Sequence, residues 1–430
     1  MDPLSLLGRS RLRFLSRCAV PRDLDNVTSL GPEDDLHGTG VDRDAIEAVW
    51  SAARAFYRTG ITPMLQLCIR RRGRVVLNRA LGHARGNAPG DGPGTRKTPA
   101  TPGTPSNVFS SAKLITAMVI HKLDEQGVLH LEDRVCEFIP EFGSHGKQWI
   151  TLRHLLSHRA GIPNIPREAL DLELLDDPDR ICELLCEMEP RTRPGSLVAY
   201  HAISGGFVLG EVVRRATGAS IREVLEKEIR EPLGLGWLHY GVKPEDVHLV
   251  AENAFTGPPP PPPAGKMLAR ALGRTLPEIV EMSNDPRFLT GIVPSGNVIT
   301  TALDLSAFLE CMRLEGELDG VRIWEPRTIH HALNEASYRN VDLTLFMPLR
   351  FGLGPMLGDS PIGIFGRDTA KAFGHVGLSN VFPWADPERE ISVALLTTGK
   401  PVLSLHAVRL VQLLGAIGTA FPKKETAAAS

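Results

Sequence analysis

Hydrophobic and polar positions fall into three patterns along this chain. Residues 44–56 place apolar side chains at helical spacing, and residues 64–69 and 74–80 form two short apolar runs around an Arg-Arg-Gly turn. This order predicts a helix followed by a β-hairpin. The middle of the chain is mainly helical, and its predicted helices cover residues 150–163, 170–188, 204–217, 221–233 and 301–311.

The C-terminal third returns to a strand pattern. Residues 371–383 and 391–398 are extended runs joined by an Asp-Pro-Glu-Arg turn, and a last helix is predicted over 404–417. We therefore predict an α+β fold. An antiparallel sheet flanked by helices is formed by residues 41–135 together with 340–420, and a mainly helical lobe over 136–339 is inserted between them.

Three segments carry little regular pattern. The first 40 residues are predicted to be a poorly structured arm, and residues 421–430 a flexible tail. Six consecutive prolines at 258–263 lie in a predicted exposed insertion, 256–265, of polyproline II character. Two segments are expected to line the functional site: the Gly- and Pro-rich loop 84–105 and the region 256–290.

The most apolar helix begins beside two polar side chains. Residues 114–120 are almost entirely apolar, which predicts a buried helix, and Gly127 marks its end. Ser110 and Lys113, three residues apart, share one face at its entrance. An apolar setting disfavours the charged form of lysine. A neutral lysine is a base for a serine proton, and free amides at a helix start bind an oxyanion.

Spacing alone does not distinguish this pair from an ordinary helix cap. A second Ser-x-x-Lys, Ser144 with Lys147, lies in a Gly-flanked polar run that predicts a solvated loop. His154 and His158 have a spacing that can chelate a metal but lack a third ligand, so we interpret them as structural histidines. Taken alone, Tyr200 is typical of a core tyrosine with a bonded hydroxyl.

Composition excludes several classes of protein. A net charge of −2 over 430 residues gives no field that would attract nucleic acid. No apolar run is long enough to span a bilayer, so no stable membrane insertion is expected. The N-terminus lacks the continuous apolar stretch of a secretory signal, and the six cysteines are scattered. We expect reduced thiols and a cytoplasmic location.

Three motifs in order resemble the serine β-lactamase and penicillin-binding-protein superfamily. They are FSSAKLITAMVIHKLDEQGVLHLEDRV, PGSLVAYHAISGGFVLGEVVRRATG and FGHVGLSNVFPWADPEREISVALLTTG. The similarity extends over residues 45–415 and is nearest to the branch of class C β-lactamases, D-amino-acid peptidases and family VIII carboxylesterases. A β-lactamase/transpeptidase-like fold is implied. No Gly-x-Ser-x-Gly elbow is present, which disfavours an α/β-hydrolase.

The resemblance also implies roles for single residues. Ser110 matches the nucleophile, Lys113 the neighbouring base, and Tyr200 the tyrosine that shares the proton shuttle. Gly377 lies on the strand beside the pocket, and the amides of Ser110 and Leu378 would form the oxyanion hole. His375 occupies the position of the family's lysine and would be a weaker anchor for a substrate carboxylate.

Two departures favour an ester substrate. Ala202 stands where the lactamases usually have asparagine, and no export signal is visible. We predict a carboxylesterase-like serine hydrolase acting on a small-molecule ester or amide, without a cofactor or metal. Hydrolysis of β-lactams or D-amino peptides, acyl transfer to a metabolite, and a non-catalytic scaffold remain alternatives. The oligomeric state stays open.

Overall fold

A nine-stranded antiparallel sheet organises the protein, for which a computed structural model describes residues 16–402 and 406–424. Its order is β1-β3-β2-β16-β15-β14-β11-β10, with β4 paired to β3. The strands are β1 (Thr28–Leu30), β2 (Met64–Arg71), β3 (Arg74–Arg85), β4 (Thr98–Pro99), β10 (Arg350–Phe351), β11 (Met356–Leu357), β14 (Phe373–Gly374), β15 (Phe382–Asp386) and β16 (Ile391–Thr397). Strands from both ends of the chain thus meet at the β2–β16 pair, which confirms the predicted α+β class.

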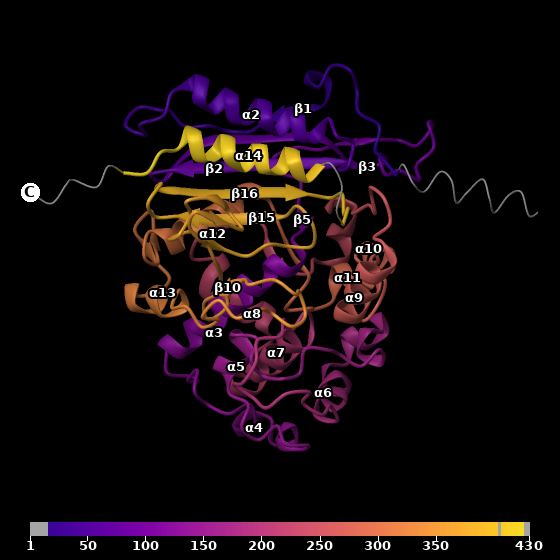
Figure 1. Cartoon of the computed structure of the whole chain (residues 1–430), viewed down its shortest axis with the longest axis vertical. Helices are drawn as coiled ribbons and strands as arrows, with labels where there is room; N and C mark the ends of the chain where they lie inside the picture. The colour runs from indigo at the N-terminus through magenta and orange to yellow at the C-terminus, as the bar shows by residue number, and fades with distance from the viewer. Residues whose placement is uncertain (1–15, 403–405, 425–430) are drawn as a thin grey trace, which may run out of the picture.

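Helices cover both faces of this sheet. Helices α2 (Arg43–Tyr57) and α14 (His406–Ala420) pack against each other on one face, above the sheet in Figure 1. Helix α12 (Ala302–Arg313) packs on β2, β15 and β16 from below. Helix α12 lies in the segment 136–339, which was assigned to the helical lobe, although it packs on the sheet. The domain boundaries therefore stay a prediction.

The helical part lies below the sheet (Figure 1). Its longer helices are α3 (Ala112–Glu125), α6 (Pro178–Cys186), α7 (Ser204–Thr217) and α9 (Pro262–Leu272). Its shorter helices are α4 (Val135–Phe138), α5 (Leu152–Leu156), α8 (Ile221–Leu225), α10 (Leu276–Met282), α11 (Pro286–Thr290) and α13 (Pro326–Ala332). Within the described residues, no helix is both long enough and apolar enough to cross a bilayer.

Two predicted helices are shorter than their patterns. Helix α5 starts at the predicted cap Thr151 but ends at Leu156, because His158 adopts a left-handed conformation with φ 58°. The pattern over 170–188 is divided into short 3₁₀ turns and α6, which begins at Pro178. Proline fits the first position of a helix but breaks its interior, so the chain restarts there.

The segments expected to be irregular are partly ordered. Residues 28–30 form β1 on the edge of the sheet, although they lie in the predicted arm. Phe421 is fully buried, so the predicted tail begins after it; residues 1–15 and 425–430 lie outside the described residues. The predicted polyproline II character is wrong for Pro262 and Pro263, which open α9, because proline fits the first turn of a helix; Pro261 before them is extended. Four of the six prolines are exposed, whereas Thr256 and Gly257 are buried.

Three smaller strands lead to the site. Strands β5 (Ser106–Asn107), β7 (Val298–Thr300) and β6 (Leu238–Tyr240) form a separate antiparallel sheet. The amide of Val108 then donates to the Val298 carbonyl at 3.0 Å. These bonds hold the chain that leads into α3, where the candidate residues begin.

Candidate active site

Ser110 lies in a single 3₁₀ turn, Phe109–Ser111, immediately before α3. Phe109 has φ 49°, a left-handed conformation that is uncommon for a residue with a bulky side chain. Such backbone strain is often found at functional sites. Behind the turn, α3 is buried over most of its length, as its apolar sequence predicts.

The predicted serine–lysine pair is formed. Lys113 Nζ lies 3.3 Å from Ser110 Oγ and donates to the Ser295 carbonyl at 3.1 Å. The lysine is 9% exposed, and no carboxylate pairs with it among the described residues. Burial lowers its pKa to about 7, so neutral and charged forms coexist at neutral pH.

Tyr200 reaches the same place from a loop before α7. Its ring lies under the Lys113 ammonium, with 4.9 Å from Nζ to the ring centroid, and its hydroxyl interacts with Ser110. Burial raises the pKa of Tyr200 well above the usual value, and the bond to Ser110 opposes that shift. The structure therefore brings Ser110, Lys113 and Tyr200 together.

An aromatic cluster fixes this tyrosine. The His158 ring lies 4.6 Å from the Tyr200 ring and 5.0 Å from that of Phe351. His158 Nδ1 accepts from the His201 amide at 3.2 Å, and burial lowers the pKa of His158 well below its usual value. His154 Nδ1 accepts from the Thr151 amide. Both histidines are structural, as predicted, but the contact of His158 with Tyr200 was not foreseen.

The turn after β14 forms the side of the site that adjoins the sheet. The Ser111 hydroxyl donates to the His375 carbonyl at 2.7 Å, and Gly377 pairs with Val381. A Cβ on Gly377 would lie 2.3 Å from the Val108 carbonyl oxygen, so only glycine fits. Within the described residues, neither the Ser110 amide nor the Leu378 amide donates a hydrogen bond to the protein.

His375 differs from its expected role. Its imidazole is fully buried, does not line the cavity beside Ser110, and has a pKa lowered to about 3 by burial. Its Nδ1 lies 3.0 Å from the Val376 carbonyl, so Nδ1 carries the proton and Nε2 is an unpaired acceptor. A neutral, buried acceptor does not bind a carboxylate, which argues against the predicted anchoring role.

An apolar cavity of about 90 Å³ opens beside Ser110. Leu378 and Ala202 lie in its wall, and Asp171 is the one charged side chain that lines it among the described residues. Part of the region 256–290 lines it as predicted, whereas the loop 84–105 does not. The other lining residues are Phe109, Ala169, Leu170, Leu172, Leu175, Ile203, Phe207, Leu272, Ile279, Met282, Phe288, Val293, Ser295 and Gly296.

The second Ser-x-x-Lys is not the solvated loop that was predicted. Lys147 is fully buried and donates to the carbonyls of Cys186 and Met188. Ser144 donates to the same Cys186 carbonyl at 2.9 Å. Both side chains therefore bind backbone at the end of α6, which explains why the polar run is buried and identifies the pair as structural.

Comparison with known proteins agrees with the resemblance to β-lactamases and penicillin-binding proteins. The family model named Beta-lactamase matches residues 52–415, and the chain belongs to this family. The esterase/beta-lactamase LipL of Mycobacterium tuberculosis is 30% identical over 306 residues, which are 67% of this chain and 68% of LipL.

Two solved structures extend the comparison. A penicillin-binding protein homologue from Caulobacter crescentus has a TM-score of 0.75 at 27% identity, covering 89% of this chain and 99% of its own. A family VIII carboxylesterase has a TM-score of 0.74 at 25% identity, covering 87% and 98%. Together these relatives indicate a hydrolase and confirm the family inferred from the sequence.

Proposed function

We propose that this protein is a serine hydrolase that cleaves carboxylic esters through an acyl-enzyme on Ser110. The observation that carries the proposal is the opening of Ser110, with Lys113 and Tyr200 behind it, into an apolar cavity that lacks a cationic side chain among the described residues. An apolar pocket beside a nucleophile favours an uncharged substrate.

Acylation begins with the Ser110 proton. Neutral Lys113, whose pKa is about 7, accepts this proton while Ser110 Oγ bonds to the carbonyl carbon of the ester. The carbonyl oxygen becomes an oxyanion, and the amides of Ser110 and Leu378 donate to it. The carbon–oxygen bond to the alcohol then breaks, and the alcohol oxygen takes a proton from the Tyr200 hydroxyl, which is replenished from Lys113.

Deacylation repeats these steps with water. The Tyr200–Lys113 pair accepts a proton from a water molecule, whose oxygen bonds to the acyl carbon. The oxyanion forms again and collapses, the bond to Ser110 Oγ breaks, and Oγ regains a proton. The 3.3 Å distance from Lys113 Nζ to Ser110 Oγ, and the contact of the Tyr200 hydroxyl with the same serine, support this shared shuttle.

Three features favour esters over β-lactams. Ala202 lines the cavity, and its methyl side chain has no hydrogen-bonding group to hold an amide arm. His375 is buried and neutral, so it offers no positive charge to a carboxylate. The exposed Asp171 at the cavity repels an anionic substrate. LipL is named for both activities, so β-lactam hydrolysis is the competing function.

Hydrolysis of p-nitrophenyl butyrate and of a chromogenic cephalosporin tests this proposal. We expect kcat/KM for the ester to exceed that for the cephalosporin about a hundredfold. Ser110→Ala should abolish ester turnover, whereas Ser144→Ala, at the structural Ser-x-x-Lys, should retain it. Faster turnover of the cephalosporin, or full esterase activity in Ser110→Ala, would overturn the proposal.

A further inference from the structure

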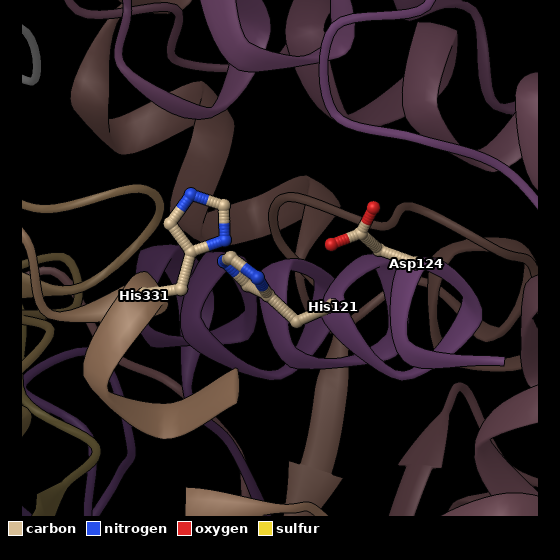
Figure 2. Close-up of side chains that lie close together, drawn as sticks. All are labelled: His121, Asp124 and His331. Carbon is tan, nitrogen blue, oxygen red and sulfur yellow. The ribbon is translucent and has the colours of Figure 1, made fainter. Parts of the chain in front are cut away.

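Two histidines and an aspartate converge at the far end of the helix that begins beside Ser110. His121 and Asp124 lie three residues apart on α3, and His331 lies on α13 (Figure 2). One ligand atom from each of the three side chains lies within 4.8 Å of the other two. The two helices contact each other, so the three groups face one small space between them.

The buried histidine has an atom without a partner. His121 is fully buried, and its Nε2 lies 2.9 Å from the Leu353 carbonyl. A carbonyl only accepts, so Nε2 carries the proton and Nδ1 presents a lone pair. This Nδ1 is buried and unpaired among the described residues. A backbone carbonyl that orients a histidine through its second nitrogen is the usual arrangement behind a metal ligand.

We propose that His121, Asp124 and His331 form a binding site for a zinc ion. Two imidazoles and one carboxylate suit zinc, which binds nitrogen and oxygen at about 2.0–2.2 Å. Tetrahedral ligand atoms lie about 3.5 Å apart, so the three side chains need to approach by about an ångström. His121 is buried, whereas Asp124 and His331 are partly exposed, so these two side chains would make most of this movement.

The neighbouring groups define what completes the site. His130 Nδ1 lies 3.5 Å from Asp124 Oδ1 and is exposed, so it is placed to supply a fourth ligand. Arg153 Nη2 donates to His331 Nε2 at 3.3 Å, so Nδ1, the nitrogen that faces His121 in Figure 2, carries the proton. Zinc bound at Nδ1 would move this proton to Nε2, and Arg153 would then have to withdraw. Its guanidinium also pairs with the exposed Glu132, which gives it an alternative position at the surface.

The ion would stabilise the contact between two helices and would take no part in catalysis. His121 follows Lys113 by eight residues on α3, which corresponds to about 12 Å along the helix. Zinc between α3 and α13 would tie the helix that carries the nucleophile to a helix from a distant part of the chain. Ligand binding to the folded state alone also stabilises that state.

Zinc binding by the full-length protein tests the site directly. The protein is stripped with EDTA, titrated with zinc against a chromophoric chelator, and melted with and without zinc. We expect one equivalent of zinc, a higher melting temperature, and a cobalt-substituted form with visible absorption bands. His331→Ala and Asp124→Asn should each weaken binding at least about tenfold and reduce the thermal shift at the same zinc concentration.

The matched control is His330→Ala. His330 is the exposed neighbour of His331 on α13 and contacts Glu315 instead, so its loss should leave zinc affinity unchanged. The partly exposed His331 and Asp124 are chosen for substitution because replacing the buried His121 risks unfolding. Absence of zinc binding in the wild type, or binding that neither His331→Ala nor Asp124→Asn weakens, would overturn the inference.

Discussion

Lys113 Nζ lies 3.3 Å from Ser110 Oγ inside a site where no carboxylate neutralises it among the described residues. A charged amine there is costly, and burial lowers its pKa to about 7. The same arrangement that destabilises the ammonium form provides a base close to the serine. Four measurements on activity follow from this pair and its surroundings.

The first prediction concerns pH. If neutral Lys113 is the base, kcat/KM should rise with pH through an apparent pKa near 7. His158, His201 and His375 do not contribute, because burial holds their pKa values well below this range. Lys113→Arg should lose nearly all activity, because a guanidinium stays charged. A profile without this rise between pH 6 and 8 would contradict the assignment.

Lys400 provides the control for that profile. It is also fully buried with a pKa lowered to about 7, and its Nζ lies 4.7 Å from the Phe109 ring centroid. Lys400→Met should therefore retain the rise in kcat/KM near pH 7. For both lysines the unfolded state binds more protons above pH 7, so stability should increase as pH rises from about 7 to 10.

The second prediction concerns the Tyr200 hydroxyl. Tyr200→Phe retains the ring that packs on His158 and lies under the Lys113 ammonium, and it removes only the group that transfers a proton. We expect kcat to fall by about 10²–10⁴ with an unchanged melting temperature. Steady-state kinetics and thermal melts measure both. Wild-type kcat in Tyr200→Phe would exclude this residue from the proton shuttle.

The third prediction concerns the turn that presents the Leu378 amide. A Cβ on Gly377 would lie 2.3 Å from the Val108 carbonyl oxygen, so Gly377→Ala must displace the turn. Loss of one oxyanion donor lowers kcat by about 10²–10³. Gly90→Ala, whose Cβ has no neighbour within 4 Å, should behave as wild type. Equal kcat values for the two variants would argue against the Leu378 amide as a donor.

The fourth prediction concerns the size of the acyl group. Met282 on α10 lines the cavity, so Met282→Trp should fill part of it and shift the preference of kcat/KM toward shorter p-nitrophenyl esters. Met267 on the neighbouring helix α9 is 44% exposed and does not line the cavity. Met267→Trp should leave the chain-length profile unchanged, and identical profiles for the two variants would mean that this cavity does not bind the acyl chain.

The local parts of the site were accessible from sequence. Ser110 and Lys113 are one helical turn apart, so their proximity follows from spacing alone. Tyr200 and Leu378 were placed only by resemblance, because no local pattern reports contacts between distant segments. The packing of His158 on Tyr200 was missed for the same reason.

Other features depended on packing that no local pattern encodes. His375 was expected to face the substrate, but its immediate neighbours in sequence do not reveal that it is fully buried. Lys147 was expected in solvent because its neighbours are polar, yet the carbonyls that bind it come from α6. His121 and Asp124 lie on one helix, but only the fold brings His331 to them.

The most direct test of the central claim is mass spectrometry of the protein after reaction with a fluorophosphonate probe. We expect one adduct, on the peptide that contains Ser110, and no labelling of Ser110→Ala. An adduct on another serine, or equal labelling of Ser110→Ala, would show that Ser110 is not the nucleophile.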